Sequence, residues 1–172
     1  MSEFGSWQFA RATAADAPAV AAFQTMVWDQ TYSGLIAEEM LAATSTDRTS
    51  RWTERISTGE RDVTLARIGS EIVGVASTSK GTPPHYGLPS TELCSFSLRT
   101  DVRGTGLADQ LLREAIGRED AHLLVFDVNE RARRFYRRHG LVAFGDPQID
   151  EGTGLMERRM VRSHFGASEF ST

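Results

Sequence analysis

A turn with two glycines, Gly104 and Gly106, constrains the fold of this chain more than any other feature of its sequence. It follows a β-rich run over residues 91–98 and precedes apolar residues that recur with a helical period over 105–117. A strand joined directly to an amphipathic helix indicates an α/β arrangement. Because glycine has no Cβ atom, backbone N–H groups at the helix N-terminus can approach a phosphate closely. The turn is therefore either an anion site or an ordinary turn that uses glycine.

Two known phosphate-binding motifs do not fit this turn. A P-loop requires a lysine, which is missing here. The dinucleotide fingerprint fails because Asp109 stands where a third small residue is needed. The turn alone leaves its ligand open.

The rest of the chain predicts strands and helices in the order β, α, α, three strands, α, β, α, β, β. Start and stop signals support the order: Thr13 with Asp16 resembles a capping box, Gly69 suits a tight hairpin turn, and Asn129 caps a helix that stops at Gly140. The predicted strands are 7–11, 63–68, 72–78, 91–98, 123–128, 141–144 and 155–161, the last two around a Gly/Pro/Asp loop. Besides the helices after Thr13, Gly106 and Asn129, helical segments are predicted at 38–41 and 51–56, separated by a Ser/Thr-rich stretch.

Composition indicates one globular domain, over residues 7–162, with poorly ordered ends at 1–6 and 163–172. The chain has 172 residues, of which 40% are hydrophobic, and lacks both an apolar run of membrane-spanning length and a secretory signal. We therefore expect a cytoplasmic protein without a membrane partner, in keeping with its single cysteine, Cys94. A net charge of −4 does not favour nucleic acid, and the four histidines lack metal-ligand spacing.

Two motifs carry a resemblance to a known family. Arg103-x-x-Gly106-x-Ala108 resembles the Q/R-x-x-G-x-G/A signature of the GNAT acetyltransferases, whose amides bind the pyrophosphate of acetyl-CoA. Residues 129–141, N-x-R-A-x-x-F-Y-x-x-x-G-L, resemble the family's second element at the expected distance. The resemblance covers residues 7–162.

The resemblance implies a fold and a set of donor-binding residues. The fold would be an α/β domain with a mixed, mostly antiparallel sheet of six or seven strands, helices on both faces, and a V-shaped splay between two central parallel strands. The cofactor would be acetyl-CoA, without a metal. By the resemblance, its binding residues are Leu98, Arg99, Arg103, Gly104, Thr105, Gly106, Leu107, Ala108, Asn129 and Tyr136.

The resemblance also assigns chemical roles. The Leu98 amide would polarise the acetyl carbonyl, and the Tyr136 hydroxyl would protonate the departing thiolate. Tyr136 is otherwise a core residue, since Ala132 and Phe135 share its helix face. Asn129 would bind the pantetheine amides, cap its helix, or do both.

A base is needed because only about one part in 2,500 of a primary amine is neutral at pH 7. Glu92 is the candidate, since it stands eleven residues before Arg103, the spacing of the histone-acetylating branch. In a regular strand Glu92 and Leu98 share a face, although a bulge would undo this. Asp127 is a second candidate, and an ordered water is a third. The ribosomal-protein branch places its glutamate at the position of Leu124, which argues against such a substrate.

The acceptor is the least constrained part of the prediction. We expect its pocket between the first two helices, the 81–89 loop and the final hairpin, with Trp28, Tyr32, His85 and Tyr86 as candidate lining residues. Arg133 and Arg134 are candidates for approaching the 3′-phosphate of CoA. The favoured activity is direct acetyl transfer to a primary amine in a ternary complex. Alternatives are a protein or peptide acceptor, a longer acyl group, or a non-catalytic acyl-CoA sensor. The oligomeric state stays open, a homodimer included.

Overall fold

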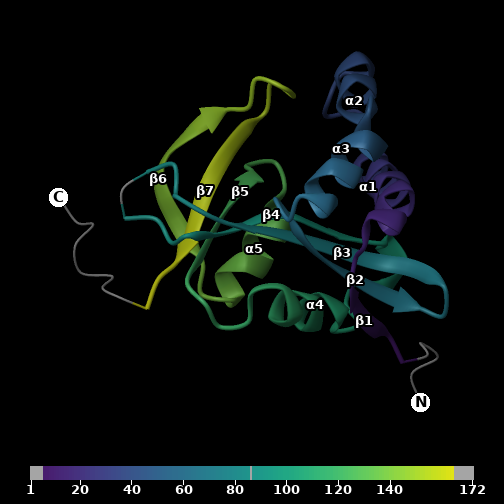
Figure 1. Ribbon diagram of the computed structural model, residues 1–172. Helices are drawn as coiled ribbons and strands as arrows, with labels where there is room; N and C mark the ends of the chain where they lie inside the picture. Colours follow the sequence, from purple (N-terminus) through teal and green to yellow (C-terminus); the bar gives the residue numbers. More distant parts are fainter. Residues whose placement is uncertain (1–5, 86, 165–172) are drawn as a thin grey trace.

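A computed structural model describes residues 6–85 and 87–164 and shows one seven-stranded mixed sheet with helices on both faces (Figure 1). The strand order is β1-β2-β3-β4-β5-β7-β6. The strands are β1 (Gln8–Arg11), β2 (Asp62–Ile68), β3 (Glu71–Lys80), β4 (Thr91–Leu98), β5 (Ala121–Phe126), β6 (Val142–Ile149) and β7 (Met156–Arg162). The helices are α1 (Ala17–Tyr32), α2 (Glu38–Ser45), α3 (Arg48–Ser57), α4 (Leu107–Ile116) and α5 (Glu130–Arg138). The predicted fold class is confirmed.

Among the strands of the described residues, one pair of neighbours, β4 and β5, runs parallel, and these two strands separate early. The two strands pair at Glu92 with His122 and at Leu93 with Leu123, whereas the remainder of β4, up to Leu98, has no partner in β5. The predicted V-shaped splay is therefore present between the two central strands.

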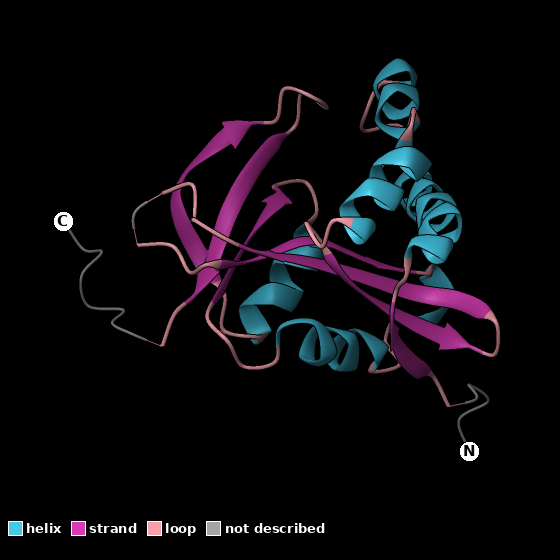
Figure 2. Ribbon diagram, in the orientation of Figure 1, coloured by secondary structure: helices cyan, strands magenta, loops and turns pink. Residues whose placement is uncertain are grey.

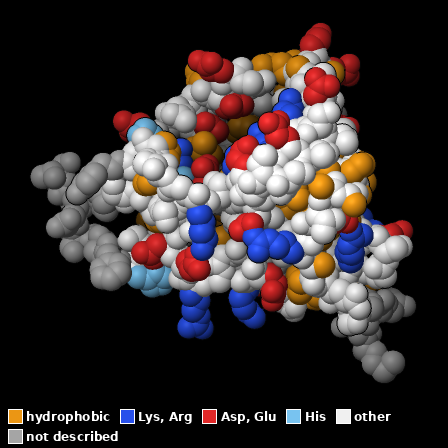
Figure 3. All heavy atoms as spheres, in the orientation of Figure 1, with side chains coloured by type: hydrophobic (Ala, Val, Ile, Leu, Met, Phe, Trp, Pro, Cys, Tyr) orange, Lys and Arg blue, Asp and Glu red, His pale blue; other side chains and the backbone are white. Residues whose placement is uncertain are grey.

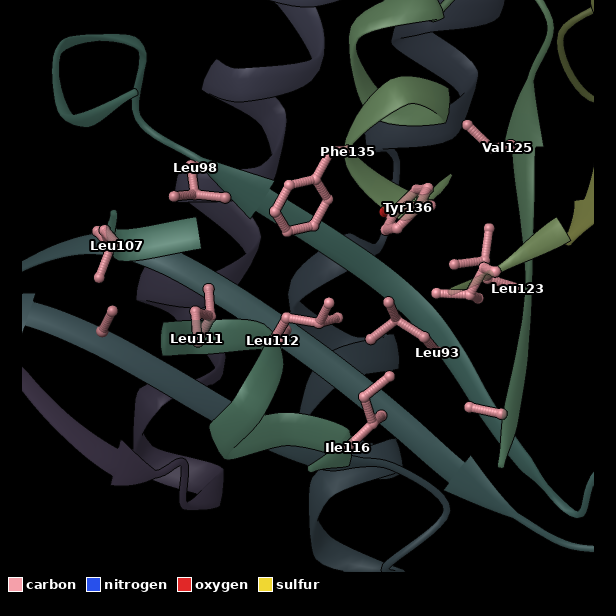
Figure 4. Close-up of a cluster of buried hydrophobic side chains, with 14 of the residues drawn as sticks. Leu93, Leu98, Leu107, Leu111, Leu112, Ile116, Leu123, Val125, Phe135 and Tyr136 are labelled. Atoms are coloured by element: carbon pink, nitrogen blue, oxygen red, sulfur yellow. The ribbon is translucent and has the colours of Figure 1, made fainter. Parts of the chain in front are cut away.

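The sheet divides the core into two layers. On one face, α4 and α5 pack on the centre of the sheet; Figure 4 shows Leu111 and Leu112 of α4 and Phe135 and Tyr136 of α5 gathered beside β4. On the opposite face, α1 and α3 pack on β2 and β3 around Trp52 and other buried residues (Figure 2). Burial of these apolar faces is the main source of stability.

Local signals position most element boundaries as predicted. Asp16 accepts a hydrogen bond from the Thr13 N–H at 2.8 Å, closing a short 3₁₀ turn that leads into α1. Gly69, with φ of 58°, makes the turn between β2 and β3. Asn129 accepts a hydrogen bond from the Ala132 N–H at 3.2 Å and caps α5.

Several predicted boundaries are wrong. The helical segments predicted at 38–41 and 51–56 are longer in the structure and form two separate helices where the predicted order has one. Only residues 46–47 separate α2 from α3, and Asp47 adopts a φ of 53° there. Gly145 and Pro147 lie inside β6, at a shift of register between Phe144 and Gln148, and the hairpin turn comes after β6 ends. β5 ends at Phe126, two residues earlier than predicted.

Other predictions fall where the structure gives little description. The predicted poorly ordered ends lie almost entirely outside the described residues, and so does Tyr86. Within residues 6–85 and 87–164, no helix combines the length and the apolar character needed to cross a membrane.

Candidate active site

The splay between β4 and β5 exposes main-chain donors of β4. The Arg99 N–H donates to the Val73 carbonyl at 3.0 Å, so Arg99 is hydrogen-bonded to β3. N–H groups of successive residues in an antiparallel strand point to alternate edges. The amides of Leu98 and Phe96 therefore point away from β3 and into the splay, where β5 no longer pairs with β4. Phe96 is a functional candidate that motif matching alone did not identify.

A cavity of about 270 Å³ opens at this splay and brings together residues of several predicted roles. Of the predicted donor-binding residues, it is lined by Leu98, Arg103, Gly104, Ala108, Asn129 and Tyr136. The predicted acceptor residues Trp28 and Tyr32 of α1 also line it. We call it the splay cavity.

The glycine turn forms the entrance of α4 beside the splay cavity. Gly104 and Gly106 have φ of 79° and 89°, which other residues rarely adopt, and a Cβ atom on either would meet nothing within 4 Å. The Leu107 N–H donates to the Thr105 hydroxyl at 3.4 Å, whereas the N–H groups of Ala108 and Asp109 have no partner within the helix and remain available to an anion. Thr105 donates its hydroxyl proton to the Val102 carbonyl at 2.7 Å, and Leu107 is fully buried in the core. Thr105 and Leu107 therefore stabilise the conformation of the glycine turn.

The second motif places Asn129 and Tyr136 on the opposite wall. The Asn129 side-chain amide donates to the Tyr32 hydroxyl at 3.0 Å while its oxygen caps α5. Tyr136 is 7% exposed, lies against Phe96 and Phe135, and burial raises the pKa of its phenol. Among the described residues, no group hydrogen-bonds the Tyr136 hydroxyl. It is both a core residue and a lining residue of the splay cavity.

A β-bulge in β4 changes which residues share a face. Ser95 pairs with Ser77 and Leu93 with Thr78, which leaves Cys94 without a partner. The parity of a regular strand is thus broken, and Glu92 lies on the sheet face opposite to Leu98. Glu92 does not line the splay cavity.

Two other candidates, Arg99 and Asp127, are held in ion pairs and do not line the splay cavity. Arg99 binds Asp101 and Glu71 at 2.6 and 2.9 Å, so its side chain does not line the cavity. Asp127 accepts hydrogen bonds from Arg158 at 3.0 and 3.2 Å. The Arg158 hydrogen bond lowers the pKa of Asp127, which makes this carboxylate a weak base.

The arginines that line the splay cavity differ from those proposed for the CoA 3′-phosphate. Arg133 donates to the Asp127 carbonyl and Arg134 pairs with Glu130, whereas Arg131 and Arg138 line the splay cavity. Their seven-residue spacing on α5 puts Arg131 and Arg138 on one helix face, a signal that the sequence contained.

A family profile described as an acetyltransferase (GNAT) domain matches residues 20–161. The chain belongs to the GNAT acetyltransferase family. Comparison with curated protein sequences gives no match. The activity class is accordingly acyl transfer.

Solved GNAT structures share the fold at low sequence identity. The PaiA N-acetyltransferase of Thermoplasma acidophilum, in complex with coenzyme A, has a TM-score of 0.68 and 17% identity, covering 90% of this chain and 98% of its own. Apo-form YjaB from Escherichia coli has a TM-score of 0.69 and 18% identity, covering 91% and 97%. A structure titled histone acetyltransferase HPA2 and related acetyltransferase, from Corynebacterium glutamicum, has a TM-score of 0.68 and 24% identity, covering 92% and 96%. These similarities concern the GNAT fold alone.

Proposed function

We propose that the protein is an N-acetyltransferase that moves an acetyl group from acetyl-CoA to a primary amine. The observation that carries the proposal is the splay cavity, in which unpaired β4 amides, a glycine-lined helix N-terminus and the Tyr136 phenol converge. When bound, acetyl-CoA supplies an activated thioester. A catalytically silent binding module would use the strand amides to hold the donor but would not need the Tyr136 phenol as an acid.

The described residues fit acetyl-CoA. Space beside Gly104 and Gly106 is open where a Cβ atom would stand, which leaves room for a pyrophosphate against the α4 N-terminus. Arg103, Arg131 and Arg138 add positive charge around the cavity. The splay, lined by Phe96–Leu98 on one side, accommodates an extended arm with amide groups.

Main-chain donors of β4 stabilise negative charge on the acetyl carbonyl oxygen. The amides of Phe96 and Leu98 are held in place by the strand, so no reorganisation is needed when charge develops. A single donor of this kind contributes about 3 kcal/mol in other acyl-transfer enzymes.

Tyr136 is the proposed acid. Burial raises the pKa of its phenol and keeps it protonated, and the same burial disfavours a thiolate bound beside it. The raised phenol pKa weakens the acid, whereas the destabilised thiolate accepts a proton more readily. The two effects oppose each other, so proton transfer from phenol to sulfur stays within reach. The proton needs to travel only within the cavity.

Glu92 is the proposed base, and it acts on the opposite sheet face. With one residue lost to the bulge, Glu92 lies about 10 Å along β4 from Phe96 at roughly 3.3 Å per residue, so a water carries the proton between amine and carboxylate. Attack on one side of β4 and thiolate protonation on the other keep the base and the acid apart.

The test is release of free thiol from acetyl-CoA when the purified protein is offered pools of small amines, amino acids, aminoglycosides and peptides, with the product identified by mass. Turnover that adds one acetyl group to one amine supports the proposal. Tight acetyl-CoA binding with no thiol release in any pool contradicts it and favours a protein acceptor or the sensor.

A further inference from the structure

A second cavity, of about 520 Å³, lies on the α1 face of the sheet, and Trp28 lines both it and the splay cavity. Its walls come from α1, α2, α3 and Arg61, which directly precedes β2, and its floor comes from β3 and β4. Four arginines line it: Arg48, Arg51, Arg55 and Arg61. We call it the arginine cavity.

The arginines outnumber their counter-ions. Arg61 and Arg55 share one carboxylate, Glu60, at 3.1 and 3.6 Å. Within residues 6–85 and 87–164, neither Arg48 nor Arg51 forms an ion pair. The concentration of positive charge stands out in a chain whose net charge is −4. Charge of one sign inside a concave surface attracts ligands of the opposite sign.

Arg48 shows the imbalance most clearly, because its side chain is buried. The residue is 9% exposed, and its guanidinium donates to the Thr25 hydroxyl at 2.8 Å and to the Thr44 carbonyl at 3.0 Å. It also lies over the Trp28 ring at 5.9 Å. Asp29 is a neighbouring negative charge but forms no ion pair with it. A buried cation bonded only to neutral groups loses hydration that an anionic ligand restores.

The floor of the arginine cavity is held by a chain of buried hydrogen bonds. The Trp52 indole donates to the Gln24 side-chain oxygen at 2.8 Å, and the Gln24 nitrogen donates to the Ser95 hydroxyl at 3.1 Å. The Ser95 and Ser77 hydroxyls lie 2.6 Å apart. These bonds join α3, α1, β4 and β3, so the cavity is preorganised.

The arginine cavity adjoins the proposed chemistry. Ser95, on its floor, directly precedes Phe96, whose amide points into the splay, and Glu92 lies on the same sheet face. Figure 3 shows the surface hollowed between the helical side and the β6–β7 side, with basic and acidic side chains in the hollow. Trp28 is the side chain that the arginine cavity and the splay cavity share.

We infer that the arginine cavity is the acceptor site and that it takes a small primary amine carrying a carboxylate or phosphate group. The inference rests on the proposed acetyl transfer. The anion binds Arg48 and Arg51, and the amine extends past Trp28. The ammonium gives one proton to the base, and the neutral nitrogen attacks the acetyl carbon to form the C–N bond. The C–S bond breaks, the thiolate takes a proton from the acid, and the second proton lost by the nitrogen restores the acid through solvent. The arginines fix the anionic end and take no part in these bond changes.

The experiment compares amines that differ only in their anionic group: O-phosphoethanolamine with ethanolamine, and 4-aminobutyrate with butylamine, with spermidine as a cationic amine. Thiol release is measured for each. We expect kcat/KM at least tenfold higher for one anionic amine than for its neutral partner. Preference in only one pair distinguishes phosphate from carboxylate recognition.

Single variants test whether the preference for anionic amines comes from the arginine cavity. Arg51→Gln, at an exposed position, should raise KM for the anionic amine at least tenfold and leave acetyl-CoA affinity unchanged. Arg118→Gln, exposed beyond α4, is the matched control and should change neither. Arg61→Gln serves as a second variant, with thermal unfolding to verify folding.

Two results overturn the inference. Equal or better turnover of ethanolamine, butylamine or spermidine overturns it while the proposed function stands. If no amine releases thiol, the proposed function fails. Calorimetry with O-phosphoethanolamine and 4-aminobutyrate on the CoA-loaded protein then tests separately whether the arginine cavity binds an anionic amine. If the anionic amines bind and Arg51→Gln abolishes this binding, the arginine cavity remains an anion site. If neither amine binds, the inference is overturned.

Discussion

The two cavities on either side of β4 are built from different kinds of groups. Apart from α1, the splay cavity draws on two short segments, 96–108 and 129–138, and its expected contacts are largely main-chain amides. The arginine cavity draws on α1, α2, α3, β3 and β4, and its charged groups stand at the ends of long side chains. Main-chain geometry tolerates changes of side chain, whereas a side-chain pocket changes with each substitution. A donor site can therefore stay constant in a family while the acceptor site varies.

The largest expected effect is that of Gly106→Glu on the donor side. The new carboxylate would stand at the α4 N-terminus where a phosphate is expected, so acetyl-CoA affinity should fall at least 100-fold by calorimetry. Gly69→Glu, at another positive φ with open space around it, is the matched control for backbone strain. Equal affinity in both variants would show that the turn is not the phosphate site.

Tyr136→Phe should lower kcat by about 100-fold, because it removes the proposed acid, and should leave acetyl-CoA affinity unchanged. Tyr32→Phe removes the other phenol that lines the splay cavity and should change kcat less than fivefold. Thiol release and calorimetry measure the two quantities. Similar kcat losses in both variants would reduce Tyr136 to a packing role.

Glu92→Gln tests whether the opposite face of β4 supplies the base. At pH 7 we expect kcat/KM to fall by about 10- to 100-fold, and the deficit to shrink toward pH 10, where the amine, of pKa about 10.4, begins to deprotonate unaided. The measurement is a pH–rate profile of thiol release. Asp127→Asn is the control, since the Arg158 hydrogen bond already lowers the pKa of Asp127. A deficit that is constant with pH would exclude Glu92 as the base.

The smallest expected effect concerns stability on the α1 side. The Thr13 backbone N–H, together with Arg67, lowers the pKa of Asp16 below its ordinary value of 3.8. A carboxyl with a lowered folded-state pKa stabilises the fold above pH 3.8, and this contribution is lost as pH falls through the folded-state value. Asp16→Ala should therefore cost about 1 kcal/mol of unfolding free energy at pH 7 and less near pH 3.

Denaturant unfolding at both pH values measures the effect, with Glu54→Ala, exposed on α3, as the control. Acetyl-CoA affinity should stay unchanged in Asp16→Ala. A loss of affinity would show that the α1 side of the sheet and the splay cavity are coupled and are not independent sites.

Prediction from the sequence succeeded where signals were local. The glycine turn, the Asn129 cap and the Gly69 hairpin each depend on residues within one turn of chain, and all three lie where they were predicted. It failed where the decisive contact was distant. Pro147 reads as a loop residue, yet pairing with β7 draws it into a bulged strand.

The sequence by itself determined the order of the strands, the glycine turn and the Asn129-capped helix, because these depend on propensity, periodicity and capping over a few residues. Tertiary structure decided the rest. The bulge at Cys94 turned Glu92 to the face opposite Leu98, and the packing of α1 and α3 on β2 and β3 brought Arg48 and Arg51 to one cavity. Strand register and helix docking are settled by contacts between distant segments, and no window of sequence contains both partners.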